Sequence, residues 1–188
     1  MRPSFVALVA SALLAACSPA AQDSGANASG PDAKGDAVAS SGQHLPKVPV
    51  VITRANGGPP VKLSIEIALG RQEQEEGLMH RTDLGPGDGM LFPMIPARMP
   101  NFWMKDTPTP LDLLFIAMDG TVVHLVAGAK PNDRTPLFAE QPVAGVLELR
   151  GGDAARLGIA EGDSVNWGTC ASEAEPEPSA EMDNFCPA

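Results

Sequence analysis

The 188-residue sequence contains no tyrosine, only three cysteines and few aromatic residues of any kind, 4% in total. It is also poor in basic residues, with 13 lysines and arginines against 23 aspartates and glutamates, which gives a formal net charge of −10. Nucleic-acid binding requires clustered lysine and arginine to neutralise phosphates, and the sequence has no such cluster. We therefore expect no nucleic-acid partner.

Glycine and proline, in contrast, are abundant, with 19 residues of each. Because both interrupt helices, the composition argues against a helix bundle or a coiled coil and favours a strand-built domain with many turns. The expected fold class is mainly β: a single compact domain, barrel-like or a sandwich, with one short helix and with disordered segments on both sides.

The first 17 residues have the order of a bacterial lipoprotein signal peptide. An apolar stretch over residues 5–16 is too short for the roughly 20 residues that span a bilayer as a helix. It ends in Leu14, two alanines and Cys17, an order that resembles a lipobox, in which the cysteine is lipidated. We expect an exported protein whose only membrane contact is this anchor. Ser18 favours the outer membrane, facing the periplasm.

Composition divides the remaining chain into three parts. Residues 18–47 are rich in Ala, Ser, Gly and Pro and are expected to form a disordered tether, since they cannot bury enough surface to fold. Residues 48–168 carry the mainly β pattern. Residues 169–188 have five acids and no base, and we expect an acidic, disordered tail. In an oxidising compartment its Cys170 and Cys186 favour a disulfide over two free thiols.

Alternation of apolar and polar residues predicts a hairpin of residues 48–54 with 61–67. A second hairpin spans residues 111–126 around Asp119-Gly120, a dipeptide suited to a two-residue type I′ turn. That turn predicts the cross-strand pairs Phe115–His124 and Ile116–Val123. Further predicted elements are a helix at 71–79, strands at 146–149 and 164–167, and between those strands a turn of helix capped by Asp153 and ended by Gly158.

Residues 84–110 combine nine glycines or prolines with large apolar side chains, which predicts a structured loop that carries the functional site. Alternation within it assigns Phe102 and Met104 to the core. The candidate ligand-binding residues are Arg81, Trp103, Lys105, Asp106 and Asp112. They supply an aromatic platform, cations and carboxylates for a small polar ligand. Alternatively, Lys105 and Asp112 pair only to close the loop while Trp103 packs.

An enzyme would use Asp112 with Lys105, or Glu76 with His80, as a general base and a cation. No nucleophile elbow, triad order or paired-carboxylate signature supports catalysis, so no catalytic residue is assigned and a hydrolase-like enzyme stays an alternative.

Soft side chains that suit Cu(I) are also clustered in the sequence. They are Met79, His80, Met90, Met94, Met99 and Met104. Methionine fills irregular cores well, and these residues show no regular ligand spacing. We expect neither a metal nor another cofactor, with copper binding as an alternative.

Five motifs in order resemble the domain of unknown function 192 family. They lie at residues 77–81, 89–92, 102–107, 110–116 and 146–149. The resemblance implies a compact, mainly β domain in secreted or lipid-anchored bacterial proteins, without an established activity. This chain departs from the family at Asp106, where Asn is usual, and at Ala117, where Asp is common. The expected function is a non-catalytic binding or scaffold domain for a small polar ligand, a glycan or an envelope partner.

Lipidation of Cys17 is directly testable in cells. A palmitate analogue supplied during growth should label the parent protein, and Cys17→Ala should lose that label because the thiol is the acyl acceptor. Equal labelling of the two proteins would contradict the anchor.

Overall fold

The computed structural model describes residues 42–172 and 179–187. Cys17 and residues 18–41 of the expected tether lie outside the described residues. No helix in the described ranges has the length and apolar character needed to cross a membrane.

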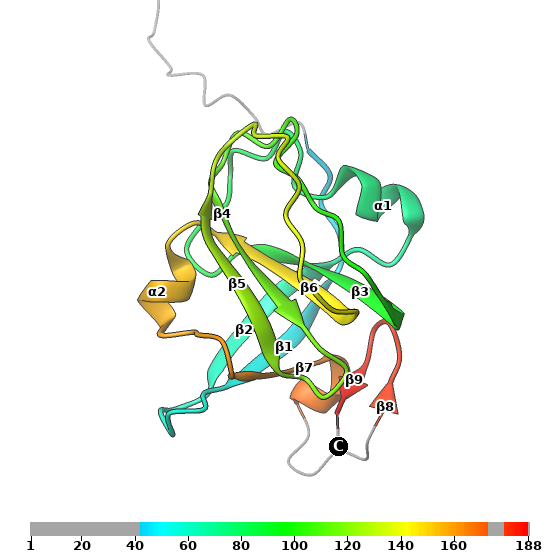
Figure 1. The fold of residues 1–188 in the computed structure, drawn as a ribbon, viewed down its shortest axis with the longest axis vertical. Coiled ribbons are helices and arrows are strands. Elements are labelled where there is room, and N and C mark those ends of the chain that lie inside the picture. The colour runs from blue at the N-terminus through cyan, green and yellow to red at the C-terminus, as the bar shows by residue number, and fades with distance from the viewer. Residues whose placement is uncertain (1–41, 173–178, 188) are drawn as a thin grey trace, which may run out of the picture. The chain divides into compact units, whose positions relative to one another are not determined.

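The described chain forms one nine-stranded mixed sheet with two short helices (Figure 1). The strands are β1 (Lys47–Thr53), β2 (Val61–Ile67), β3 (Gly89–Arg98), β4 (Leu111–Ile116), β5 (Val122–Ala129), β6 (Val143–Arg150), β7 (Ser164–Trp167), β8 (Ser179–Ala180) and β9 (Phe185–Cys186), and the helices are α1 (Arg71–Glu76) and α2 (Asp153–Leu157). The strand order is β5-β4-β6-β3-β2-β1-β7-β9-β8, with β2 and β3 parallel. The prediction of a mainly β single domain is confirmed.

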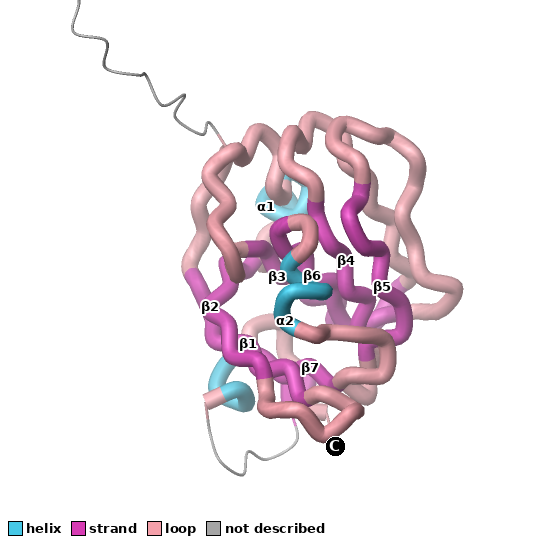
Figure 2. Tube along the Cα trace, turned by 90° about the vertical axis from the view of Figure 1, so that its left-hand side faces the viewer, coloured by secondary structure: helices cyan, strands magenta, loops and turns pink. Residues whose placement is uncertain are grey.

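The sheet is not closed into a barrel, although it curls enough for the start of β5 to meet β7. A single bridge joins Thr121 to Ser164, and Val122 N donates to Asp163 O at 2.8 Å. The curl creates two buried apolar clusters, one on each face of the sheet. Helices α1 and α2 lie on opposite sides of the molecule (Figures 1 and 2).

The β4–β5 hairpin has the predicted strands but a different turn. Phe115 lies opposite His124 as predicted, whereas Ile116 pairs with Val122 instead of Val123. A type I′ turn needs positive φ at both central residues, and here only Gly120 has it, at +81°. Ala117 N donates to Thr121 O at 2.9 Å, so the loop has three residues, 118–120, instead of two, and a bulge at Val123 of β5 shifts the register.

Residues 84–110 are not the single irregular loop that their glycines and prolines predicted. Residues 89–98 form β3, which pairs with β6 over Gly89–Pro93 and then shifts register before Arg98. Proline cannot donate to a sheet ladder, and Pro93 and Pro96 lie at or within this irregularity, which accommodates them.

Both helices differ in detail from the prediction. Helix α1 stops at Glu76 instead of reaching residue 79, because Gly77 leaves helical geometry with a φ of +52°. In α2 the cap position is Gly152, while Asp153 is the first helical residue and Gly158 ends the helix in left-handed geometry as predicted. The side chain of Asp153 instead accepts Gly87 N and pairs with Arg156.

Order begins earlier in the chain than the predicted boundary at Val48. Gln43 Nε2 donates to the carbonyls of Glu73 and Gly77 at 2.7 and 3.1 Å, at the carboxyl end of α1. Leu45 N donates to Glu66 Oε2 at 2.9 Å. The last residues of the expected tether therefore belong to the folded unit, because their polar groups satisfy a helix end and a buried carboxylate.

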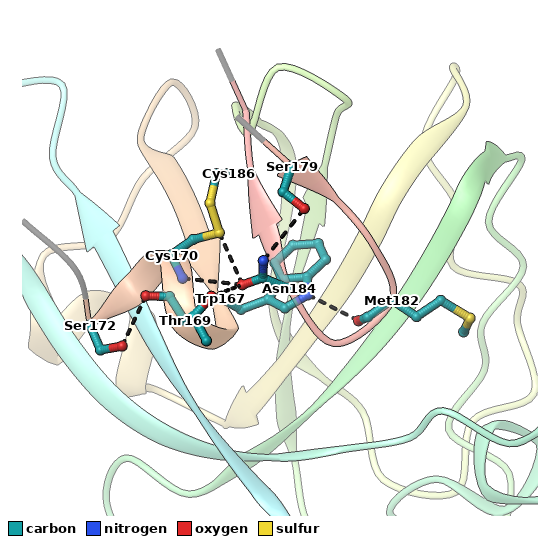
Figure 3. Close-up of a disulfide and its surroundings, with 8 residues drawn as sticks. All are labelled: Trp167, Thr169, Cys170, Ser172, Ser179, Met182, Asn184 and Cys186. Atoms are coloured by element: carbon teal, nitrogen blue, oxygen red, sulfur yellow. Dashed lines mark hydrogen bonds between the residues drawn. A yellow bond between two sulfur atoms is a disulfide. The ribbon is translucent and has the colours of Figure 1, made fainter. Parts of the chain in front are cut away.

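The acidic tail contributes to the core, which corrects the prediction of disorder for residues 179–187. Phe185 is fully buried and stacks on Trp167 with 4.2 Å between ring centroids. A disulfide joins Cys170 to Cys186, with Cα atoms 5.3 Å apart, and Trp167 Nε1 donates to the carbonyl of Met182 (Figure 3). The acidic composition misled because one aromatic residue and one cysteine are enough to hold this short segment in place.

Candidate functional site

A groove of about 560 Å³ lies between α1, β3 and the segment that follows β3. Its apolar walls are aromatic rings and thioethers from Met79, Phe92, Met94, Met99, Phe102 and Trp103. Phe102 packs edge-on against Phe92 with 5.2 Å between centroids, whereas Trp103 is 51% exposed. The volume is in the range of small-molecule sites.

Glu148 lies at the base of this groove. It occupies the interior strand β6, opposite Met90 of β3 and Leu113 of β4, and only 4% of its surface is exposed. Within the described residues, its carboxyl group has no hydrogen-bond or ion-pair partner. Every side-chain oxygen there that is sealed from solvent does have a hydrogen-bond partner, so the unpaired oxygens of Glu148 must keep some contact with solvent. The carboxyl oxygens are therefore accessible only through the groove that they line.

Burial without a partner changes the protonation of this group. Removal from water disfavours the charged carboxylate and raises the pKa of Glu148 from 4.5 to about 8. At neutral pH the side chain is mainly a neutral acid that both donates and accepts hydrogen bonds. Perturbed carboxyl groups in clefts are concentrated at functional sites.

Asp112, in contrast, is a buried carboxylate whose two oxygens both accept hydrogen bonds from the protein. Its Oδ1 accepts Gly128 N at 2.7 Å, and its Oδ2 accepts the N–H groups of Gly152 and Ala154, both at 2.9 Å. These three bonds tie β4 to the end of β5 and to the start of α2. Asp112 does not line the groove.

Arg81 also connects separate segments of the fold and does not line the groove. Its guanidinium is buried and contacts Glu66 at 3.1 Å, Asp83 at 2.6 Å and the carbonyl of Gln43 at 2.8 Å. The residue thereby joins β2, the segment after α1 and the start of the ordered chain. Of the five predicted ligand-binding residues, Arg81, Asp106 and Asp112 thus do not line the groove.

Trp103 and Lys105 do line the groove, and the loop that carries them turns sharply at Asp106. Asp106 has a φ of +52°, a conformation that Asp and Asn tolerate better than most residues, and its carbonyl accepts His80 N at 2.8 Å. Lys105 Nζ lies 3.4 Å from Asp106 Oδ2. The alternative pairing of Lys105 with Asp112 is not formed in the described residues.

The soft side chains considered for copper occupy different environments. Met79, Met94 and Met99 line the groove, whereas Met90 and Met104 are buried in the core. No group of three or more His, Cys, Asp or Glu side chains in the described chain is arranged to hold a metal ion. Glu76 and His80 were the second pair considered as a general base and a cation. Glu76 lines the groove and His80 does not.

A second hollow, of about 620 Å³, lies beside β5 and residues 136–141. It is lined by Val123, Phe138 and other side chains, most of them exposed or half-buried, and no buried unpaired polar group of the described residues faces it. The smaller groove with Glu148 is therefore the better candidate site.

Glu148 is not among the site residues predicted from the sequence, although it lies in one of the five family motifs, residues 146–149. The available signal was an acid inside the apolar run Val146, Leu147, Glu148, Leu149. In the sheet, the residues opposite Glu148 on the two neighbouring strands, Met90 and Leu113, are also apolar. An acid in a strand buried on both faces has no route to solvent except a cavity.

Comparisons with known proteins agree with this fold. The family model DUF192, described as "Uncharacterized ACR", matches residues 51–167. A structure from Novosphingobium aromaticivorans DSM 12444, a protein of unknown function, is 42% identical, covers 74% of this chain and 100% of its own, and has a TM-score of 0.62. One from Sinorhizobium meliloti 1021, described as a candidate transcription regulator, is 38% identical, covers 67% and 98%, and has a TM-score of 0.63. No curated protein matches the chain.

Asp112 and Lys105 should differ in their effect on folding. Asp112→Ala leaves three backbone donors without their acceptor and should lower the free energy of unfolding by about 3 kcal/mol. Lys105→Ala removes a partly exposed ion pair and should cost less than about 1 kcal/mol. Urea denaturation of both variants measures the two values, and an Asp112→Ala protein as stable as the parent would refute the bracing role.

The Glu148 carboxyl should make the protein less stable as the pH rises. Because the folded-state pKa, about 8, lies above the ordinary value of 4.5, the native state holds the proton more tightly than the unfolded state. Stability is therefore lost progressively above the unfolded pKa, by about 4 kcal/mol between pH 5 and pH 9. Glu148→Gln should lack this loss, whereas the exposed control Glu140→Gln should keep it. Denaturation curves with the same pH dependence in all three proteins would be inconsistent with a raised pKa.

Proposed function

The chain belongs to the DUF192 family, and we propose that it works as a small-ligand-binding module of the cell envelope, acting by binding and not by turnover. The observation that carries the proposal is the groove with Glu148 at its base. A buried acid without a protein partner is costly, and a ligand that completes its hydrogen bonds would offset that cost.

The proposed location rests on the signal sequence. Cys17 is the proposed lipidation site, and the outer membrane facing the periplasm is the proposed destination. Residues 18–41 separate Cys17 from the folded unit, enough for a reach of roughly 25 Å if that segment behaves as a flexible chain. A domain on such a tether would meet small molecules or envelope proteins in the periplasm.

Two other functions have less support. The relative from Sinorhizobium meliloti is described as a candidate transcription regulator, but an excess of acids over bases in this chain does not favour contact with phosphates. A hydrolase based on Lys105 and Asp112 lacks support because Asp112 already accepts three backbone N–H groups.

Ligand binding can be tested by NMR on the ¹⁵N-labelled protein. Pools of sugars, peptides, amines, carboxylates and metal salts, Cu(I) included, should contain at least one class that causes saturable shifts at groove amides such as Leu78 and Phe102. Amides of Val123 and Phe138, beside the second hollow, serve as the internal control. If no class perturbs the groove amides at millimolar concentration, or if shifts appear only at the control amides, the proposal fails.

A further inference from the structure

We propose that the ligand of the groove is an organic cation, a primary or secondary ammonium on an apolar body, whose N–H groups bind the Glu148 carboxylate. This inference rests on the proposed binding function and specifies the chemical class of the ligand. Two features of the groove support it, the unpartnered carboxyl group and the walls, and the charges at the rim do not oppose it.

The missing donors come first. Other buried carboxylates in the described chain are satisfied: Glu66 by Arg81 and Leu45 N, and Asp163 by the N–H groups of Ala55 and Ala160. Glu148 receives no donor from the protein within the described ranges. What it lacks is a hydrogen-bond partner, and the strongest donors to its carboxylate form are charged ones. A ligand ammonium supplies both the N–H groups and the opposite charge.

The walls suit the rest of such a ligand. Aromatic faces attract cations through the ring quadrupole, and methionine thioethers adapt to irregular apolar shapes. Trp103 is half-exposed at the groove and makes no ring contact with another aromatic residue of the described chain. It is free to cover a bound cation or the alkyl or aryl group attached to it.

The rim carries charges of both signs, and most are already paired. On α1, Arg71 pairs with Glu75 at 2.7 Å. In the loop, Lys105 pairs with Asp106 at 3.4 Å.

The remaining charged groups along the groove are one base and one acid. Arg98 of β3 donates to the side-chain amide of Gln74 at 2.8 Å, and half-buried Glu76 has no ion pair among the described residues. Glu148 is mainly neutral at pH 7, so Arg98 and Glu76 balance once the paired groups are set aside. The rim therefore does not oppose the entry of a cation.

Binding by this route moves a proton. Glu148 is mainly neutral at pH 7, so an arriving ammonium displaces the carboxyl proton to the buffer and remains charged itself. Complex formation at pH 7 should therefore release about one proton. Calorimetry in two buffers that differ in ionisation enthalpy measures this number.

Three probes of similar shape separate charge from shape: 2-phenylethylammonium, neutral 2-phenylethanol and anionic 3-phenylpropanoate. Titrated into the full protein at pH 7, the ammonium should bind at least about tenfold more tightly than either analogue. Glu148→Gln, which is isosteric with the neutral acid and should fold at pH 7, should abolish that preference and the proton release. The remote Glu140→Gln should retain both.

The outcomes distinguish this inference from the binding function on which it rests. Equal binding of the alcohol or the carboxylate, or a preference that survives Glu148→Gln, would overturn the ammonium assignment while leaving the groove a binding site. No binding of any probe would also overturn the assignment, and the broader NMR pools would then decide whether the groove binds another class.

Discussion

Strand β6 is buried on both faces, and this burial determines where the molecule can place a polar group. The strand lies between β3 and β4 in a sheet that curls around it, and residues 143–149 are all buried. Alternate side chains enter the two apolar clusters, with Leu147 on one face and Val146 on the other. Glu148 shares the face of Val146, so its carboxyl group must be buried or meet a cavity.

The buried acids of the described chain fall into two groups, those that have hydrogen-bond partners in the protein and Glu148, which has none there. Asp112, Asp163 and Glu66 tie together loops and strands that are distant in sequence, and each is compensated by backbone N–H groups or by Arg81. Because these acids already have hydrogen-bond partners in the protein, they stabilise the fold and do not need a ligand to complete their hydrogen bonds. Glu148 is the exception among them, and it is also the one that lines the groove. The distinction between structural and functional acids thus follows from hydrogen-bond satisfaction, not from burial.

The sequence predicted the elements whose signals are local. Strict alternation over 61–67 and the turn-rich segment before it identified the first hairpin, and the composition identified the fold class. Strand β3 was missed because Pro93 and Pro96 are typical of loops, and only the bulge against β6 makes them acceptable in a strand. The folded tail depends on Phe185 meeting Trp167, a contact that composition does not reveal. Within the site, Trp103 and Lys105 were candidate ligand-binding residues and both line the groove, whereas Glu148 required knowledge of which strands flank β6.

The central claim is that Glu148 is a neutral, unpartnered acid at the base of a groove. A ¹³C NMR titration of the glutamate side-chain carboxyl carbons, with the Glu148 signal assigned from Glu148→Gln, tests it directly. A midpoint of about 8 is expected for this carbon, well above the ordinary glutamate value of 4.5. A midpoint near 4.5 would show a carboxylate that is already solvated or paired, and would contradict the account.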